Sequence, residues 1–232
     1  MKQTLYICGD SFCTSDTEYG DNWSDMLAKS IPNLEVVNLS MVAASNYQIY
    51  LQVDHALKNN CDYLIYNATG STRHEFSVRP VELEPDSINR YINIINPTNV
   101  GEILCSSWVN VWDKDPVHFT NKEISLIREF FTKFVDLSSM IEKNFIFIKY
   151  TLDLISKSNI KSWAWSQGGF EHPTFNPIKD WDFSNYRNNE IKINLWDYYD
   201  PTLPRPYFHV TDKDVLQKVC NYYIDMLQLK NV

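Results

Sequence analysis

The first 66 residues alternate short apolar runs with amphipathic segments, and this alternation restricts the chain to few folds. Leu5–Cys8 is apolar and stops at Gly9, which is typical of a strand buried on both faces. Residues 34–39 and 63–66 predict two further strands. Because strands separated by helices build right-handed βαβ units, the pattern predicts an α/β fold with a parallel sheet.

Two helices are expected between these strands. Asp21 or Asn22 is a suitable cap for a short helix with Trp23, Met26 and Leu27 on one side, and Ser45 for a longer one. The longer helix has its apolar residues at four-residue spacing, namely Ile49, Val53 and Leu57.

The pattern is lost from about residue 74 to 120 and again from about 166 to 190. We expect these stretches to be insertions, the first partly helical and near the mouth of any site. Elsewhere, helical periodicity predicts helices over 122–135, over 140–155 and after Thr211 or Asp212, and apolar runs predict a fourth strand at 160–165 and a fifth at 191–195. In the last helix, the residues expected to face inward are Val215, Val219, Tyr222 and Met226. No repeat or linker divides the chain, so residues 1–232 are expected to form one domain.

Composition excludes several classes of partner. The net charge of −8 argues against nucleic acid, since binding to phosphates rests on clustered Lys and Arg. No apolar stretch is long enough for a membrane span or a signal peptide, so we expect no membrane partner and a cytoplasmic location, or a virion if the chain is phage-encoded. The composition leaves the oligomeric state open.

Cofactor and metal motifs are also missing from the sequence. No Gly-rich phosphate loop follows the first strand, so we expect no nucleotide cofactor. Five scattered cysteines show no zinc-ligand spacing, and an acidic group over 180–200 lacks the regular spacing of an EF-hand. We therefore expect no metal.

The strongest chemical signal is Gly9-Asp10-Ser11, at the end of the first strand. Sites in open α/β sheets lie outside the carboxyl ends of the strands, so the Ser11 hydroxyl would face the expected crevice. The alternative is a plain turn in which Asp10 and Ser11 bond only to backbone groups.

His209, just before the last helix, is the second signal. Imidazole has the pKa needed to take a proton from a serine hydroxyl. The alternative is a histidine packed at the start of a helix.

The order of these features resembles the SGNH (GDSL-type) hydrolases. The features are Gly9-Asp10-Ser11, the segment 43–46 after strand two, a turn at Gly70 after strand three, and the late His209. The resemblance implies a flavodoxin-like three-layer sandwich, a mostly parallel sheet of about five strands, with Ser11 as nucleophile and His209 as general base.

The resemblance also implies an oxyanion hole. Its donors would be the backbone N–H groups of Ser11 and Ala43, with the Thr72 hydroxyl as third donor. Ala43 and Thr72 stand where the family has Gly and Asn, and Asn67 is an alternative third donor. Asn46 and Arg73 are candidate substrate-binding residues; for Arg73, a structural salt bridge is the alternative.

The family places an aspartate three residues before its histidine, where this chain has Pro206. Asp197, Asp200 or a backbone carbonyl would have to orient His209 instead.

The resemblance and its departures lead to two candidate functions. The first is a serine esterase or O-deacetylase that forms an acyl-serine from a small-molecule or carbohydrate ester. The second is a weakly active or inactive SGNH-fold binding or structural module, such as a phage or particle component, since the turn at Gly70 is similar to those of phage-encoded members.

Overall fold

The computed structural model describes most of the chain outside the two expected insertions. The described residues are 2–15, 20–41, 44–70, 74–77, 91–95, 104–106, 126, 129, 130, 133, 134, 136–166, 182–193, 195–198 and 210–231.

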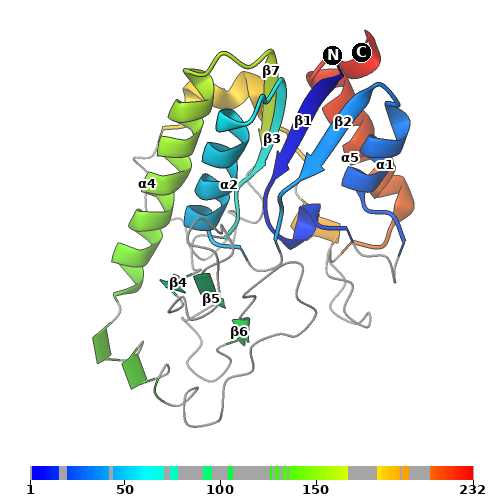
Figure 1. The fold of residues 1–232 in the computed structure, drawn as a ribbon. Helices are drawn as coiled ribbons and strands as arrows, with labels where there is room; N and C mark the ends of the chain where they lie inside the picture. The colour runs from blue at the N-terminus through cyan, green and yellow to red at the C-terminus, as the bar shows by residue number, and fades with distance from the viewer. Residues whose placement is uncertain are drawn as a thin grey trace.

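Four strands form an all-parallel sheet in the order β2-β1-β3-β7. They are β1 (Gln3–Cys8), β2 (Leu34–Asn38), β3 (Tyr63–Asn67) and β7 (Ser162–Ser166). All four lie where the apolar runs predict strands. With helices on both faces of the sheet, the fold is α/β, as the sequence predicts (Figure 1).

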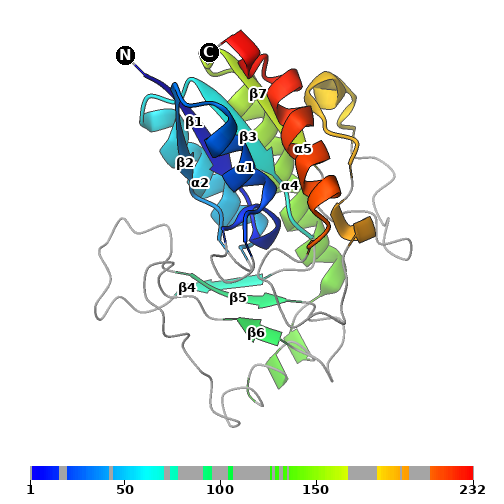
Figure 2. The same cartoon turned by 90° about the vertical axis from the view of Figure 1, so that its right-hand side faces the viewer.

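Helices α1 (Trp23–Ser30) and α5 (Lys213–Met226) cover one face, and α2 (Asn46–Lys58) and α4 (Leu137–Ser156) cover the other (Figures 1 and 2). Asn22 caps α1, Ser45 caps α2, and each forms a capping box with the residue three positions on. Asp212 caps α5. The alternatives Asp21 and Thr211 are thereby excluded as caps.

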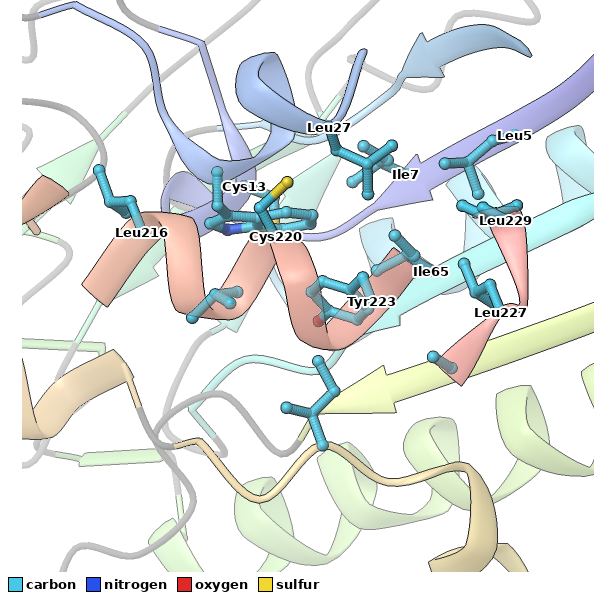
Figure 3. Close-up of a cluster of buried hydrophobic side chains, with 14 of the residues drawn as sticks. Leu5, Ile7, Cys13, Leu27, Ile65, Leu216, Cys220, Tyr223, Leu227 and Leu229 are labelled. Carbon is cyan, nitrogen blue, oxygen red and sulfur yellow. The ribbon is translucent and has the colours of Figure 1, made fainter. Parts of the chain in front are cut away.

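Each face of the sheet has its own apolar core. The α1/α5 core contains Leu5, Ile7, Leu27, Ile65, Val219 and Tyr223, part of which Figure 3 shows. The α2/α4 core contains Cys8, Ile49, Val53, Tyr66, Ile148 and Leu152.

The prediction that Tyr222 faces inward is wrong, since its side chain is 37% exposed. The buried stripe of α5 runs instead through Leu216, Val219, Cys220 and Tyr223. The expected set has spacings of four, three and four residues, so its period suits a helix, but the buried face is rotated by about one residue, toward Leu216, Cys220 and Tyr223.

Within the first expected insertion the described residues are strands rather than helix. Strands β4 (His74–Ser77), β5 (Tyr91–Ile95) and β6 (Leu104–Ser106) form a small antiparallel sheet. The β5 sequence YINII is rich in β-branched and aromatic residues, which favour strands. This sheet lies beyond the carboxyl edge of the parallel sheet in both views (Figures 1 and 2). Farther on, residues 126, 129, 130, 133 and 134 are helical, as the periodicity predicts.

The predicted fifth strand is reduced to one isolated parallel bridge, between Glu190 and Trp165. The Ile191 N–H donates to the Trp165 carbonyl at 2.7 Å, after which the described chain leaves the sheet edge for the 3-10 helix η3 (Leu195–Tyr198). Leu195, at the start of η3, is buried in the α1/α5 core. The other 3-10 helices are η1 (Ser11–Cys13), η2 (Ser184–Asn189) and η4 (Leu229–Asn231). No described helix combines the length and the apolarity needed to cross a bilayer.

Candidate functional site

Ser11 lies at the point where the strand order reverses. From β1 the chain first goes to β2 on one side, and then to β3 on the other side of β1. The crevice outside the carboxyl ends of β1 and β3 is therefore the topological switch point, the usual ligand site of open α/β sheets. Ser11 begins η1 directly beyond β1, and its side chain is only 1% exposed.

Gly9 brings the turn close to the sheet. A Cβ atom at this position would lie 2.7 Å from the Cys13 Sγ and 3.0 Å from the Asn67 Cβ. A side chain at this position therefore requires at least the Cys13 side chain to move. The glycine is therefore explained by close packing between the turn after β1 and the end of β3.

On the α1 side, polar side chains bond the carbonyls that follow Ser11. Asn22 Nδ2 donates to the Phe12 and Thr14 carbonyls, each at 3.0 Å. The Cys13 carbonyl accepts from Ser24 Oγ at 2.9 Å and from Asn38 Nδ2 at 2.7 Å.

Two side chains of the same turn also enter the apolar core between α1 and α5. Phe12 and Cys13 are both buried in it, and Figure 3 labels Cys13 among the side chains of this core. The Trp23 indole N–H, from α1, donates to the Phe12 carbonyl at 2.8 Å. The turn is thus fixed on this side by apolar packing as well as by hydrogen bonds.

On the other side, the turn is fixed through the Asp10 carboxylate, which is 1% exposed. Its Oδ1 accepts from the Phe12 N–H at 3.1 Å and from Asn67 Nδ2 at 3.3 Å. Its Oδ2 accepts from Thr69 Oγ1 at 2.5 Å, a length typical of a charge-assisted O–H···O bond. Asp10 is thus the N-cap of η1 and the link from the turn to the end of β3.

Buried amide side chains of α2 and α4 continue the hydrogen bonding beyond Thr69. Asn46, the first residue of α2, donates from Nδ2 to the Thr69 carbonyl at 3.0 Å and accepts from the Thr69 N–H at 3.0 Å. The same Nδ2 donates to Asn144 Oδ1 of α4 at 3.1 Å. Gln52 of α2 accepts the Gly9 N–H at 2.8 Å, and the Ser166 hydroxyl donates to Asn67 Oδ1.

Cys13 is the only other nucleophilic side chain of the described turn 9–15 that is fully buried beside Ser11. Burial, and after it the charge of Asp10, raise the pKa of the Cys13 thiol well above its ordinary value. Since the thiolate is the reactive form, this shift disfavours Cys13 as the nucleophile.

The described residues include only part of the predicted site. Ser11, Asn46 and Asn67 are brought together at the carboxyl edge. Asn46 is fully buried, and its amide bonds to Thr69 and Asn144. In this structure the side chain predicted to bind substrate therefore bonds to other residues of the protein. Asp197 lies in η3 and is exposed. The remaining predicted residues, Ala43, Thr72, Arg73, Asp200, Pro206 and His209, lie outside the described residues.

Sequence reasoning missed Thr69, Gln52 and Asn144. A signal for Asn144 exists, since it falls between Ile141 and Ile148 on the buried stripe of α4. A polar residue on an apolar stripe must find a polar partner, because an unpaired amide in the core costs free energy.

The described residues contain no group of three or more His, Cys, Asp and Glu side chains arranged to hold a metal ion. No protein-family model matches the chain, and no curated protein matches it.

Proposed function

We propose that the protein is a serine ester hydrolase of the SGNH type, with Ser11 as nucleophile and His209 as general base. One observation carries this proposal: the Gly9-Asp10-Ser11 turn lies at the switch point of a parallel sheet. The order β2-β1-β3-β7 also supports a flavodoxin-like arrangement, because it matches the first four strands of that order.

In the proposed reaction, Ser11 Oγ bonds to the acyl carbon as its proton passes to His209. The carbonyl π electrons move onto the oxygen, which the backbone N–H groups of Ser11 and Ala43 and the Thr72 hydroxyl stabilise. The ester C–O bond then breaks, and the alcohol leaves with the proton from His209. Water, deprotonated by His209, attacks the acyl-serine and releases the acid and free Ser11. The substrate is a small-molecule or carbohydrate ester, with Arg73 available to an acidic group on it.

A second candidate is an SGNH-type module with little or no catalysis, serving as a binding or structural part of a particle. The burial of Ser11 favours it, since a nucleophile that is 1% exposed meets substrate only after a local opening. Pro206 in place of an aspartate agrees with this candidate, because losing the orienting carboxylate lowers turnover by about 10⁴.

A fluorophosphonate probe and p-nitrophenyl acetate distinguish the two candidates. The hydrolase is labelled and turns over the ester, and both activities disappear in Ser11→Ala and fall steeply in His209→Ala. Ser15→Ala is the matched control, since Ser15 lies four residues away and is exposed. Wild-type protein that neither labels nor hydrolyses, or Ser11→Ala that labels like wild type, would refute the hydrolase.

A further inference from the structure

We infer that Thr69 and Asn144 are positioning residues in a buried chain of hydrogen bonds that begins at Asn144 on α4, reaches the Asp10 carboxylate through Thr69, and sets the orientation of Ser11. The inference rests on the proposed function in one respect, namely that Ser11 is the nucleophile.

The chain of bonds is continuous and fully buried. Asn144 Oδ1 accepts from Asn46 Nδ2 at 3.1 Å, and the Asn46 amide bonds both backbone groups of Thr69 at 3.0 Å. Thr69 Oγ1 then donates to Asp10 Oδ2 at 2.5 Å. The four residues Asp10, Asn46, Thr69 and Asn144 are each at most 2% exposed. The chain joins α4, α2, the end of β3 and the turn after β1.

The carboxylate at the end of this chain controls the turn directly. One oxygen accepts the N–H of Phe12, the residue after Ser11, and the other accepts the Thr69 hydroxyl. A carboxylate bonded at both oxygens cannot rotate without breaking one bond. Thr69 therefore fixes the plane of Asp10, and Asp10 as N-cap fixes the first turn of η1, in which Ser11 lies.

Stability alone does not require such a chain. Buried polar groups rarely stabilise a fold more than well-packed apolar residues of the same volume, whereas satisfied networks specify one geometry. The same helices pack apolar residues of α2 and α4 against the same face of the sheet, as at Ile49 and Ile148. This chain of hydrogen bonds ends at the turn that carries Ser11, where catalysis would require the nucleophile to be held in one orientation.

The experiment compares two Thr→Val substitutions. Thr69→Val removes the hydroxyl that bonds Asp10, while Thr151→Val removes an equally buried hydroxyl that bonds the Phe147 carbonyl within α4. Hydrolysis of p-nitrophenyl acetate gives kcat and KM, and amide hydrogen exchange over residues 11–14 reports on the turn whether or not the protein is active.

We expect Thr69→Val to lower kcat by about 10- to 100-fold with KM nearly unchanged, because misplacing a reacting group by about 1 Å costs about 100-fold. Exchange in the turn should quicken by about tenfold. Thr69→Ser, which restores the hydroxyl, should recover both, and Thr151→Val should change neither. Asn144→Ala should lower kcat less, and adding it to Thr69→Val should cost little more, because residues in one chain of bonds are not additive.

The inference is wrong if Thr69→Val behaves like Thr151→Val in kcat and in exchange, or if Thr69→Ser fails to restore them. A wild-type protein without hydrolysis or labelling overturns the proposed function instead. In that case faster amide hydrogen exchange over residues 11–14 in Thr69→Val still supports the role of Thr69 in positioning the turn. Unchanged exchange rejects that role.

Discussion

The turn that bears Ser11 is bound on one side by apolar packing together with hydrogen bonds, and on the other side by hydrogen bonds of polar side chains. Toward α1 and α5, Phe12 and Cys13 are buried in an apolar core, and their carbonyls accept from Asn22, Trp23 and Asn38. Toward α2 and α4, the turn meets hydroxyl and amide side chains that lead from Asp10 back to Asn144.

The difference separates stability from geometry. Apolar burial contributes about 25 cal/mol per Å² and does not depend on direction, whereas hydrogen bonds contribute less net free energy but fix distances and angles. We therefore expect changes to the apolar side chains on the α1/α5 side to act mainly on the free energy of unfolding, and changes to the polar side chains on the α2/α4 side mainly on the position of Ser11.

The largest expected effect on stability is that of Phe12→Ala. The side chain is 1% exposed and lies in the α1/α5 core, so its removal leaves a cavity and should lower the free energy of unfolding by about 3–5 kcal/mol. Urea unfolding followed by tryptophan fluorescence measures this. For comparison, Thr69→Val should cost about 1–3 kcal/mol, the penalty for a buried acceptor that loses a donor. Equal losses would remove the distinction between the two sides.

Gly9→Ala tests the place where the two sides meet. The added Cβ would lie too close to the Cys13 Sγ and tightly against the Asn67 Cβ, so at least the Cys13 side chain must move. We expect a loss of about 1–3 kcal/mol in thermal or urea unfolding, together with slower fluorophosphonate labelling. Gly70→Ala is the control for stability, since a Cβ there meets nothing within 4 Å among the described residues. If Gly9→Ala matched Gly70→Ala, the close packing at Gly9 would have no energetic weight.

One buried thiol on each side of the sheet should make the free energy of unfolding depend on pH in the same way. Burial raises the pKa of both Cys8, on the α2/α4 side, and Cys13, on the α1/α5 side, well above the ordinary value of 9.0. Above that pH the unfolded chain loses these protons while the folded chain keeps them, so the free energy of unfolding falls as pH rises. The stabilisation is complete below pH 9.

Each thiol contributes a slope of about 1.4 kcal/mol per pH unit above pH 9. Cys8→Ala and Cys13→Ala should each reduce the slope by that amount, measured by urea unfolding between pH 8 and 10.5. A slope that neither substitution reduces would mean that the thiols ionise in the folded protein.

The smallest expected effects distinguish two buried tyrosines. Among the described residues, Tyr66 Oη, on the α2/α4 side, has no hydrogen-bond partner, and the neighbouring Thr151 hydroxyl donates to the Phe147 carbonyl. Tyr66→Phe should therefore be neutral or stabilise the fold by up to about 1 kcal/mol. Burial raises the pKa of Tyr223 on α5 and the Ser166 side chain beside it lowers that pKa, so Tyr223→Phe, which removes this polar contact, should destabilise the fold by about 1 kcal/mol. Differential scanning calorimetry compares the two, and a reversed order of Tm would contradict this account.

The sequence predicts the parallel sheet well because its strands are continuous apolar runs and its helices have caps and periodic faces. Asn22, Ser45 and Asp212 are caps in the structure as well. The strands β4 to β6 were missed because their runs are short and separated by prolines.

The site was predictable only where local sequence determines it. Ser11 follows from a strand that ends in Gly-Asp-Ser, whereas the bond between Asn46 and Asn144 joins residues 98 positions apart and depends on how α2 and α4 pack. The residues near Asn46 or near Asn144 in the sequence do not indicate that these two side chains meet. The pairing of Ser11 with His209 stays a prediction.

The depth of Ser11 also has a kinetic consequence. A side chain that is 1% exposed reacts only from rare open conformations, so the protein and not the reagent limits the fastest possible modification. Raising the concentration of a reactive phosphonate would speed the reaction at first and then reach a plateau equal to the opening rate. A substrate that stabilises the open form would bypass this limit, so selectivity would come from the ability to open the site as well as from the reactivity of the ester.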